Sequence, residues 1–206
     1  MSDVIDWPID LIPTDMTWAL EANNVSYESP FTKDVQVVSM PGSRWVTTLT
    51  FTDVVGAKRQ LLETTVMALN GMAGRVRLWD FGARLVGSPQ PVLGAPVVSA
   101  AGQVGVFLAT RGWSPDSLVL RLGDWISVNG ELKRIRADVV SDGVGQATLP
   151  IFPMLRSSPP AGTPLQVDRP CGIFRLSGDN QGKFSRKPGL FVQSSVNIEF
   201  NETWST

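Results

Sequence analysis

Histidine is absent from the 206 residues of this chain, and cysteine occurs once, at Cys171. Without histidine, no Ser-His or Cys-His pair can activate a nucleophile, and the Cys/His clusters that bind zinc cannot form. A single cysteine excludes an intrachain disulfide. These absences remove the commonest catalytic and metal-binding chemistries, so the function must depend on other residue types.

Charge and long apolar runs are scarce as well. Eighteen Lys and Arg against 19 Asp and Glu give a formal net charge of -1, so the chain lacks the basic surface that nucleic-acid binding usually requires. No run approaches the roughly 18 apolar residues of a transmembrane helix, and the acidic start MSDVIDWPID has no apolar signal-peptide core. We expect synthesis in a cytoplasm, with no membrane or specific nucleic-acid partner.

The remaining candidates for chemistry are weak. The loop SGDNQGK at 177–183 resembles a calcium site, but it lacks the run of acidic ligands that such sites use. A pair of carboxylates could support glycoside hydrolysis, and Asp80 beside Trp79 or Asp124 beside Trp125 are candidates for it. We predict no catalytic residue, no metal and no cofactor, and keep a carboxylate hydrolase only as a minor alternative.

Glycine and proline are frequent, with 19 and 15 residues, and they favour many short strands over long helices. In RWVTTLTF, at 44–51, every second residue shares a face, which is the period of a strand. The segment VNIEF, at 196–200, alternates in the same way. The sequence therefore predicts a mainly β protein.

One segment has helical periodicity. Between residues 54 and 70 the apolar positions recur on a single helical face, and they are Val55, Leu62, Val66 and Leu69. Thr52 or Asp53 could cap the start of this helix, and Asn70-Gly71 could end it in the left-handed conformation. We expect one helix, over about 54–70.

Two Pro/Gly-rich segments divide the chain. The first begins after residue 82 with GSPQPVLGAPVV, and the second surrounds Arg169-Pro170. We predict a discontinuous β-sandwich with one helix, formed by 1–85 and 169–206, with a small β-barrel-like domain inserted at 86–168. A single larger all-β domain is the alternative.

The segment LGDWISVNGELKRIRAD, at 122–138, predicts a hairpin around Asn129-Gly130. A two-residue turn would pair Ile126 with Lys133 and mix polar with apolar side chains on each face. A three-residue loop at 128–130 would pair Ile126 with Leu132 and separate them better. We favour the three-residue loop, which leaves the charges solvated or paired across the strands.

Seven tryptophans suggest large aromatic contact surfaces, in the core, at subunit interfaces or on a sugar-stacking platform. The segment GRVRLWDF favours an interface, because a strand there would put two arginines and two aromatic rings on the face opposite Val76 and Leu78. The predicted subunit-interface residues are Arg75, Arg77, Trp79 and Phe81, together with Trp113 and Trp125 of the inserted domain.

Four segments in this order resemble one family. They are the N-terminal WPIDLIPTDMTWALEANNVSYESPFTKDVQVVSMPGSRWVTTLTF, GRVRLWDFG after the helix, LRLGDWISVNGELKRI, and RPCGIFRLSGDNQGKFSRKPGLF. Together they resemble the distal tail (Dit-like) proteins at the tail tip of siphophages and prophages. The resemblance implies a belt domain, a β-sandwich with one helix, that closes into a ring, usually a hexamer.

In that family the ring joins the last tail-tube ring to the tip hub and fibres. The second domain is often C-terminal and galectin-like, whereas here it would be inserted, which weighs against carbohydrate binding. We therefore expect a non-enzymatic structural protein of the virion tail tip, made in the host bacterial cytoplasm. Its partners would be copies of itself, the tail tube, and hub and fibre proteins. A carbohydrate-binding β-module for host adsorption is the alternative.

Overall fold

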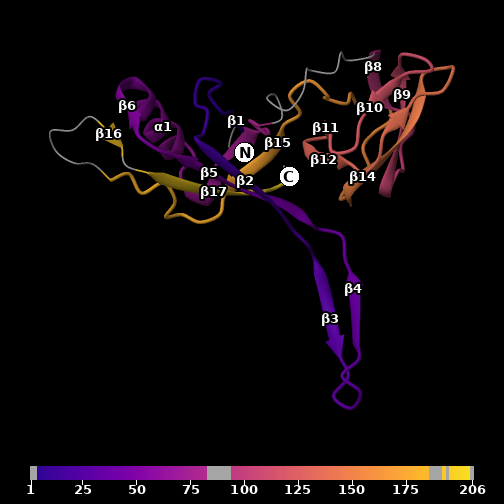
Figure 1. The fold of residues 1–206 in the computed structure, drawn as a ribbon, viewed down its shortest axis with the longest axis horizontal. Helices are drawn as coiled ribbons and strands as arrows, with labels where there is room; N and C mark the ends of the chain where they lie inside the picture. Colours follow the sequence, from indigo (N-terminus) through magenta and orange to yellow (C-terminus); the bar gives the residue numbers. More distant parts are fainter. Residues whose placement is uncertain (1–3, 83–93, 186–191, 194, 205–206) are drawn as a thin grey trace.

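A six-stranded sheet combines segments from both ends of the chain in the computed structural model, which describes residues 4–82, 94–185, 192–193 and 195–204 (Figure 1). Its strands, in spatial order, are β1 (Val4–Asp6), β7 (Arg75–Leu78), β15 (Gly172–Leu176), β17 (Val196–Glu202), β5 (Arg44–Phe51) and β2 (Asp15–Glu21). Along β5 every second side chain is buried, as the alternation in the sequence predicts. The mainly β fold with one helix is confirmed.

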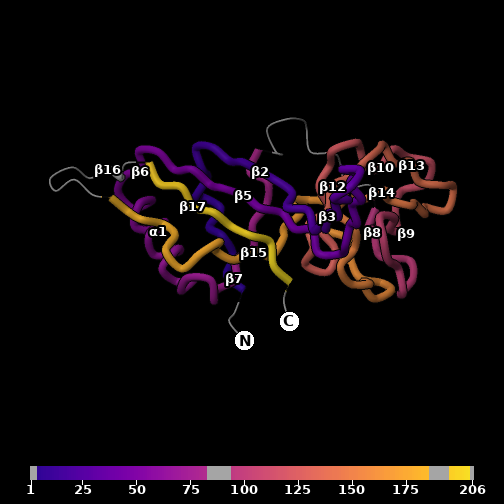
Figure 2. Tube along the Cα trace, turned by 90° about the horizontal axis from the view of Figure 1, so that it is seen from below, coloured from indigo at the N-terminus to yellow at the C-terminus, as the bar shows by residue number. Residues whose placement is uncertain are grey.

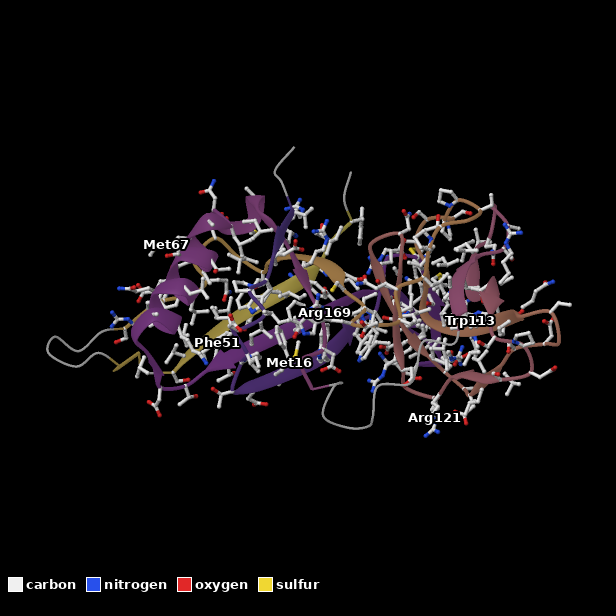
Figure 3. All side chains as sticks on the ribbon, turned by 90° about the horizontal axis from the view of Figure 1, so that it is seen from above. Met16, Phe51, Met67, Trp113, Arg121 and Arg169 are labelled. Carbon is white, nitrogen blue, oxygen red and sulfur yellow. The ribbon has the colours of Figure 1, made fainter. Side chains whose placement is uncertain are left out.

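A five-stranded sheet lies beside the first (Figure 2). It consists, in spatial order, of β11 (Trp125–Val128), β12 (Glu131–Ile135), β14 (Gln146–Leu155), β9 (Gly105–Trp113) and β8 (Gly94–Val98), and a short pair, β10 (Leu118–Leu120) and β13 (Val139–Val140), accompanies it. Figure 3 shows Phe51 among the side chains of the first sheet and Trp113 among those of the second.

Each sheet has its own hydrophobic core. Leu49, Leu62 and Phe200 belong to the first core, whereas Leu108 and Leu149 belong to the second. Chain segments up to residue 82 and from 171 onward contribute to the first core, together with Trp125, Leu132 and Phe152 of the second sheet. The expected boundary at 85/86 lies outside the described residues.

The helix α1 covers Gly56–Ala68 and is shorter than the expected 54–70. The predicted cap at Thr52 or Asp53 is wrong, because Val55 precedes the helix without a side-chain cap. Val54–Val55 instead form the short strand β6, which pairs with β16 (Val192–Gln193). Backbone pairing thus takes the place of the expected hydroxyl or carboxylate cap.

The end of the helix is where the sequence predicts it. Asn70 and Gly71 have φ angles of 49° and 66°, both left-handed, and a short 3-10 turn, η1 (Gly71–Ala73), leads to Gly74 and β7. A Cβ atom on Gly74 would lie 2.2 Å from the carbonyl oxygen of Leu69. The chain can therefore turn from α1 into the sheet only with glycine at this position.

The predicted register of the β11–β12 hairpin is wrong. Ile126 pairs with Lys133 and Ser127 with Leu132 around a two-residue turn. Asn129 and Gly130 have φ angles of 51° and 77°, as a type I′ turn requires.

The physical reason is that both faces of this hairpin are buried. Trp125 and Leu132 belong to the first core, whereas Ile126 and Val128 belong to the second. Lys133 lies on the same face as Ile126, so this face does combine a charged with an apolar side chain, which was the reason for expecting the other register. It is tolerated because partners inside the fold neutralise the ammonium group.

A long hairpin projects from the first sheet and has no counterpart in the predicted organisation. Strands β3 (Asn24–Glu28) and β4 (Val35–Ser39) pair only with each other among the described strands. Figure 1 shows this hairpin extending away from the ends of β2 and β5. We call residues 22–43 the arm.

We expect the Gly74→Ala variant to lose about 1–3 kcal/mol of unfolding free energy, because the added methyl group meets backbone atoms that cannot yield without moving the helix end. Gly178→Ala is the matched control, since its Cβ would meet nothing closer than 4.0 Å. Urea unfolding measures both, and equal losses would contradict this account of the turn.

Candidate functional site

Three of the six predicted interface residues lie inside the chain. Trp79, Trp113 and Trp125 are only 8 %, 4 % and 7 % exposed. The indole N–H of Trp113 donates to Thr110 Oγ1 at 2.8 Å, and that of Trp125 donates to Asp80 Oδ2 at 2.9 Å. These rings pack within a single copy of the chain, and none of the three presents a large surface to a neighbouring subunit.

The other three predicted residues are spread over different surroundings. Arg75 donates to the backbone carbonyl oxygens of residues 72–74, and Arg77 forms an exposed ion pair with Asp6 at 2.8 Å. Phe81 is half-buried against Trp79. Because β7 ends at Leu78, Trp79 and Phe81 do not continue the face of the two arginines. The structure therefore does not bring the six residues together into one surface.

An aromatic cluster joins the two sheets. The ring of Trp125, from β11, lies 4.8 Å from that of Trp45 and 5.3 Å from that of Trp18. Phe152, from β14, packs edge-on against Trp45 at 5.4 Å. Aromatic contacts of this kind contribute beyond the area they bury. Trp125 therefore contacts the chain's own core and fastens the second sheet to the first.

A buried carboxylate lies beside this cluster. Glu202, at the end of β17, is 1 % exposed. It accepts hydrogen bonds from the backbone N–H groups of Trp45 at 3.1 Å and Leu132 at 2.9 Å, and it forms an ion pair with Arg156. Arg156 also donates to the carbonyl oxygen of Ser43. Glu202 is thus satisfied only when both sheets are in place.

A second ion pair continues this network. The Lys133 ammonium lies 2.6 Å from Glu131 Oε2 and donates to the carbonyl oxygen of Met154 at 2.9 Å. Burial lowers the pKa of Lys133, although Glu131 opposes the shift. Burial by itself would raise the pKa of Glu131, but the Lys133 charge and the hydrogen bonds to this carboxylate outweigh it, so its pKa is lowered. Partners within the chain occupy these charges, which makes the network structural.

The two acids considered for chemistry have local partners, and so does the single thiol, which donates to the carbonyl oxygen of Arg169 at 3.2 Å. Asp80 accepts from Trp125 and from the backbone N–H of Gly82, and Asp124 accepts from the backbone N–H of Arg121. Burial raises the pKa of the Cys171 thiol, so this thiol stays protonated at neutral pH.

The arm carries a group of exposed apolar side chains. Val25, Tyr27 and Val38 lie on one face of its ribbon, and Val35 and Val37 on the other. The side chains of Tyr27, Val35, Val37 and Val38 are exposed, and Phe31 at the tip is 94 % exposed. A two-stranded hairpin alone is marginally stable in water, and both its edges are open. The arm is therefore suited to bind another protein.

The sequence shows which residues of the arm are apolar, but not that they are exposed. VQVVS, at 35–39, places valines on both faces of one strand. A strand that is apolar on both faces is normally buried between layers, and nothing local in the sequence indicates that it lacks covering layers.

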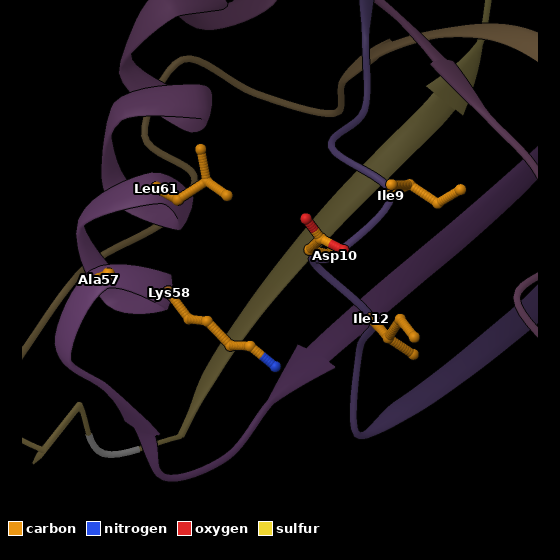
Figure 4. A pocket seen from close by; sticks show the side chains of 6 residues that line it. All are labelled: Ile9, Asp10, Ile12, Ala57, Lys58 and Leu61. Carbon is orange, nitrogen blue, oxygen red and sulfur yellow. The ribbon is translucent and has the colours of Figure 1, made fainter.

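A shallow groove lies between the loop after β1 and the helix α1 (Figure 4). It has a volume of about 440 Å³ and is lined by Ile9, Asp10, Ile12, Ala57, Lys58 and Leu61. Ile9, Ile12 and Leu61 are exposed large apolar side chains. The groove is mainly apolar and carries one charge of each sign, a composition typical of a protein-binding surface.

A second hollow lies on the five-stranded sheet. It is lined by Ser127, Asn129, Gly130 and residues 163–166, and it contains no aromatic side chain. Within the described ranges no three His, Cys, Asp or Glu residues are placed to hold a metal ion, and no helix there is long and apolar enough to cross a bilayer. The chain matches no protein-family model and no curated protein.

We expect Glu202→Ala to lower the unfolding free energy by about 3–5 kcal/mol, because it leaves Arg156 buried without its counterion and two backbone N–H groups without an acceptor. Glu28→Ala is the matched control, since it removes an exposed ion pair with Lys33 worth about 0–1 kcal/mol. Urea unfolding distinguishes the two, and similar losses would contradict the role assigned to Glu202.

We also expect Glu131 to make the fold acid-sensitive. Its pKa in the folded state is below the ordinary value of 4.5, so its charged form contributes stability above pH 4.5 that is lost as the pH falls through the lowered value. Urea unfolding at pH values from neutral to acid should show a smaller acid loss in Glu131→Gln than in the unmodified chain, although this variant is less stable at pH 7. Parallel curves would rule out this contribution.

Proposed function

We propose that this protein is a structural component of a bacteriophage tail tip. Its copies form a ring that connects the tail tube to the tip hub and fibres. The observation that supports this most is the arm, which leaves the fold as a two-stranded ribbon with apolar side chains on both faces. The resemblance of the four ordered sequence segments to distal tail proteins agrees with it.

The arm favours assembly for an energetic reason. Each apolar side chain that leaves water on binding contributes about 25 cal/mol per Å² of buried area, and the arm holds several such side chains away from the chain's own cores. The open edges of β3 and β4 can also accept a further strand. Such a ribbon gains most of its order from a partner, as a subunit arm does.

The junction of the two sheets fits the same role. A ring subunit has to hold its parts in a fixed orientation so that copies repeat one geometry. Trp125 packs against Trp45, and Glu202 binds groups from both sheets. These contacts favour a rigid unit from which the arm projects.

The alternative, a carbohydrate-binding module, has less support. Sugar-stacking platforms need exposed aromatic faces, whereas only Trp204 of the seven tryptophans is an exposed side chain, and it lies against Arg156. The other exposed aromatic side chains among the described residues are Tyr27 and Phe31 on the arm and Phe107 on β9, and none of them lines a hollow with polar groups. The hollow on the five-stranded sheet has polar groups but no aromatic ring. The observations therefore favour the ring component.

Excision of the arm tests the proposal. Residues 24–39 can be replaced by Asn-Gly, because the N–H of Met40 donates to the carbonyl oxygen of Asn23 at 2.8 Å, as the flanks of a two-residue turn do. We expect the unfolding free energy to change by less than about 1 kcal/mol, because the arm contributes to neither core, and self-association to be lost. Light scattering and negative-stain images measure assembly.

Leu122→Ser is the control variant, since it removes an exposed apolar side chain elsewhere and should leave rings intact. Immunogold labelling of intact virions tests the location, with label expected at the tail tip. A chain that is absent from virions, or an unmodified chain that forms no rings, would contradict the proposed function. An arm-less variant that still forms rings would contradict the role given to the arm.

A further inference from the structure

We propose that the groove beside α1 binds the arm tip of a second copy of this chain, so that copies join head to tail. This inference rests on the proposed self-association and identifies the two surfaces that would carry it. The bound segment is the tip between β3 and β4, and the receiving groove is lined by Ile9, Ile12, Leu61, Asp10 and Lys58.

The arm and the groove lie at opposite ends of one strand pair. In the β2–β5 ladder, Glu21 pairs with Arg44 at the end where the arm begins, and Asp15 pairs with Thr50 at the other end. The groove is formed by the loop that leads into Asp15 and by the helix that follows β5. The seven residues of β2 hold the two ends about 20 Å apart.

This placement determines which molecule can occupy the groove. Figure 1 shows the arm pointing away from α1, so the tip cannot reach the groove of its own chain. Each copy carries one arm and one groove, so every copy can give one contact and receive one. Two different surfaces that match in this way make a heterologous contact, which closes into a ring when the rotation between copies permits.

The apolar chemistry of the two surfaces matches. Phe31 projects from the arm tip almost fully exposed, and the groove offers Ile9, Ile12 and Leu61, which are all exposed as well. Figure 4 shows these three groove residues on two separate segments, the loop and the helix, with Asp10 and Lys58 among them. A hollow of about 440 Å³ has room for one aromatic side chain.

The charges match too. Lys58 in the groove and Asp34 at the tip each lack an ion-pair partner within the described ranges of the chain, and both are exposed. Asp34 uses one oxygen to accept from the backbone N–H of Val35, and the rest of its carboxylate is free for a cation. Asp10 in the groove provides the opposite charge for Lys33, whose partner Glu28 is itself exposed.

Cross-linking between copies tests the geometry. In a Cys171→Ser background, Thr32→Cys places a thiol on the arm tip without removing Phe31, and Ala57→Cys places one in the groove. A mixture of the two variants, treated with a short bismaleimide, should give a cross-linked pair that neither variant gives alone. In the control mixture Ala101→Cys takes the place of Ala57→Cys, because Ala101 is an exposed alanine between β8 and β9 of the five-stranded sheet.

Charge reversal tests the pairing. Lys58→Glu and Asp34→Lys should each lower the yield of cross-linked pairs about fivefold, because each turns an attraction into a repulsion. Both reversals together in each cross-linking partner should restore the yield. Arg121→Glu is the matched control, since it reverses an exposed charge on the side of the second sheet, far from Met67 of α1 (Figure 3), and should have no effect.

The outcomes separate this inference from the function on which it rests. If the unmodified chain forms rings but the tip and groove thiols cross-link no better than the control pair, the docking surfaces are wrong and the ring proposal stands. Failure of the double reversal to restore the yield would likewise overturn the pairing of Lys58 with Asp34. If the unmodified chain stays monomeric at millimolar concentration and the tip and groove thiols of the two variants give no cross-linked pair, both proposals fail.

Discussion

The two sheets of this protein are held together by a carboxylate that neither sheet satisfies alone. Glu202 is the last residue of β17 in the first sheet. Its carboxylate accepts hydrogen bonds from the backbone N–H groups of Trp45 in that sheet and Leu132 in the second, and it forms an ion pair with Arg156 beyond β14. A buried charge without partners is costly, so the position of the second sheet is coupled to the integrity of the first. The aromatic contact between Trp45 and Trp125 adds apolar area at the same junction.

The arm, in contrast, contributes no side chain to either core. It has regular strand pairing but no core, and its apolar side chains face solvent on both sides. In a chain with two well-packed cores, such a feature makes sense as a surface whose partner is another molecule. The proposed ring and the proposed tip-in-groove contact both follow from this contrast between a rigid body and an uncovered ribbon.

Much of the local structure could be predicted from the sequence, because it depends on neighbouring residues. The alternation of 44–51 predicts a strand with one buried face, and Asn70-Gly71 predicts the left-handed end of the helix; both are confirmed. The start of the helix could not be predicted, because Val54 and Val55, which were expected to begin it, pair with a strand about 140 positions later. Among the predicted interface residues, Trp79 is buried against partners that include Arg169, a contact with no signal in the sequence around Trp79.

The sequence by itself determined the β-rich class, the single helix, the left-handed end of that helix at Asn70-Gly71 and the absence of histidine-based chemistry, since composition and short-range patterns decide these. Only the tertiary structure decided the hairpin register. Alternation favoured separating Lys133 from Ile126, but the hairpin lies between two cores, and Glu131 neutralises the lysine on the mixed face. Tertiary structure likewise left VQVVS at 35–39 uncovered and enclosed Trp125. Burial depends on which distant segments cover a strand, and that information is spread over the whole chain.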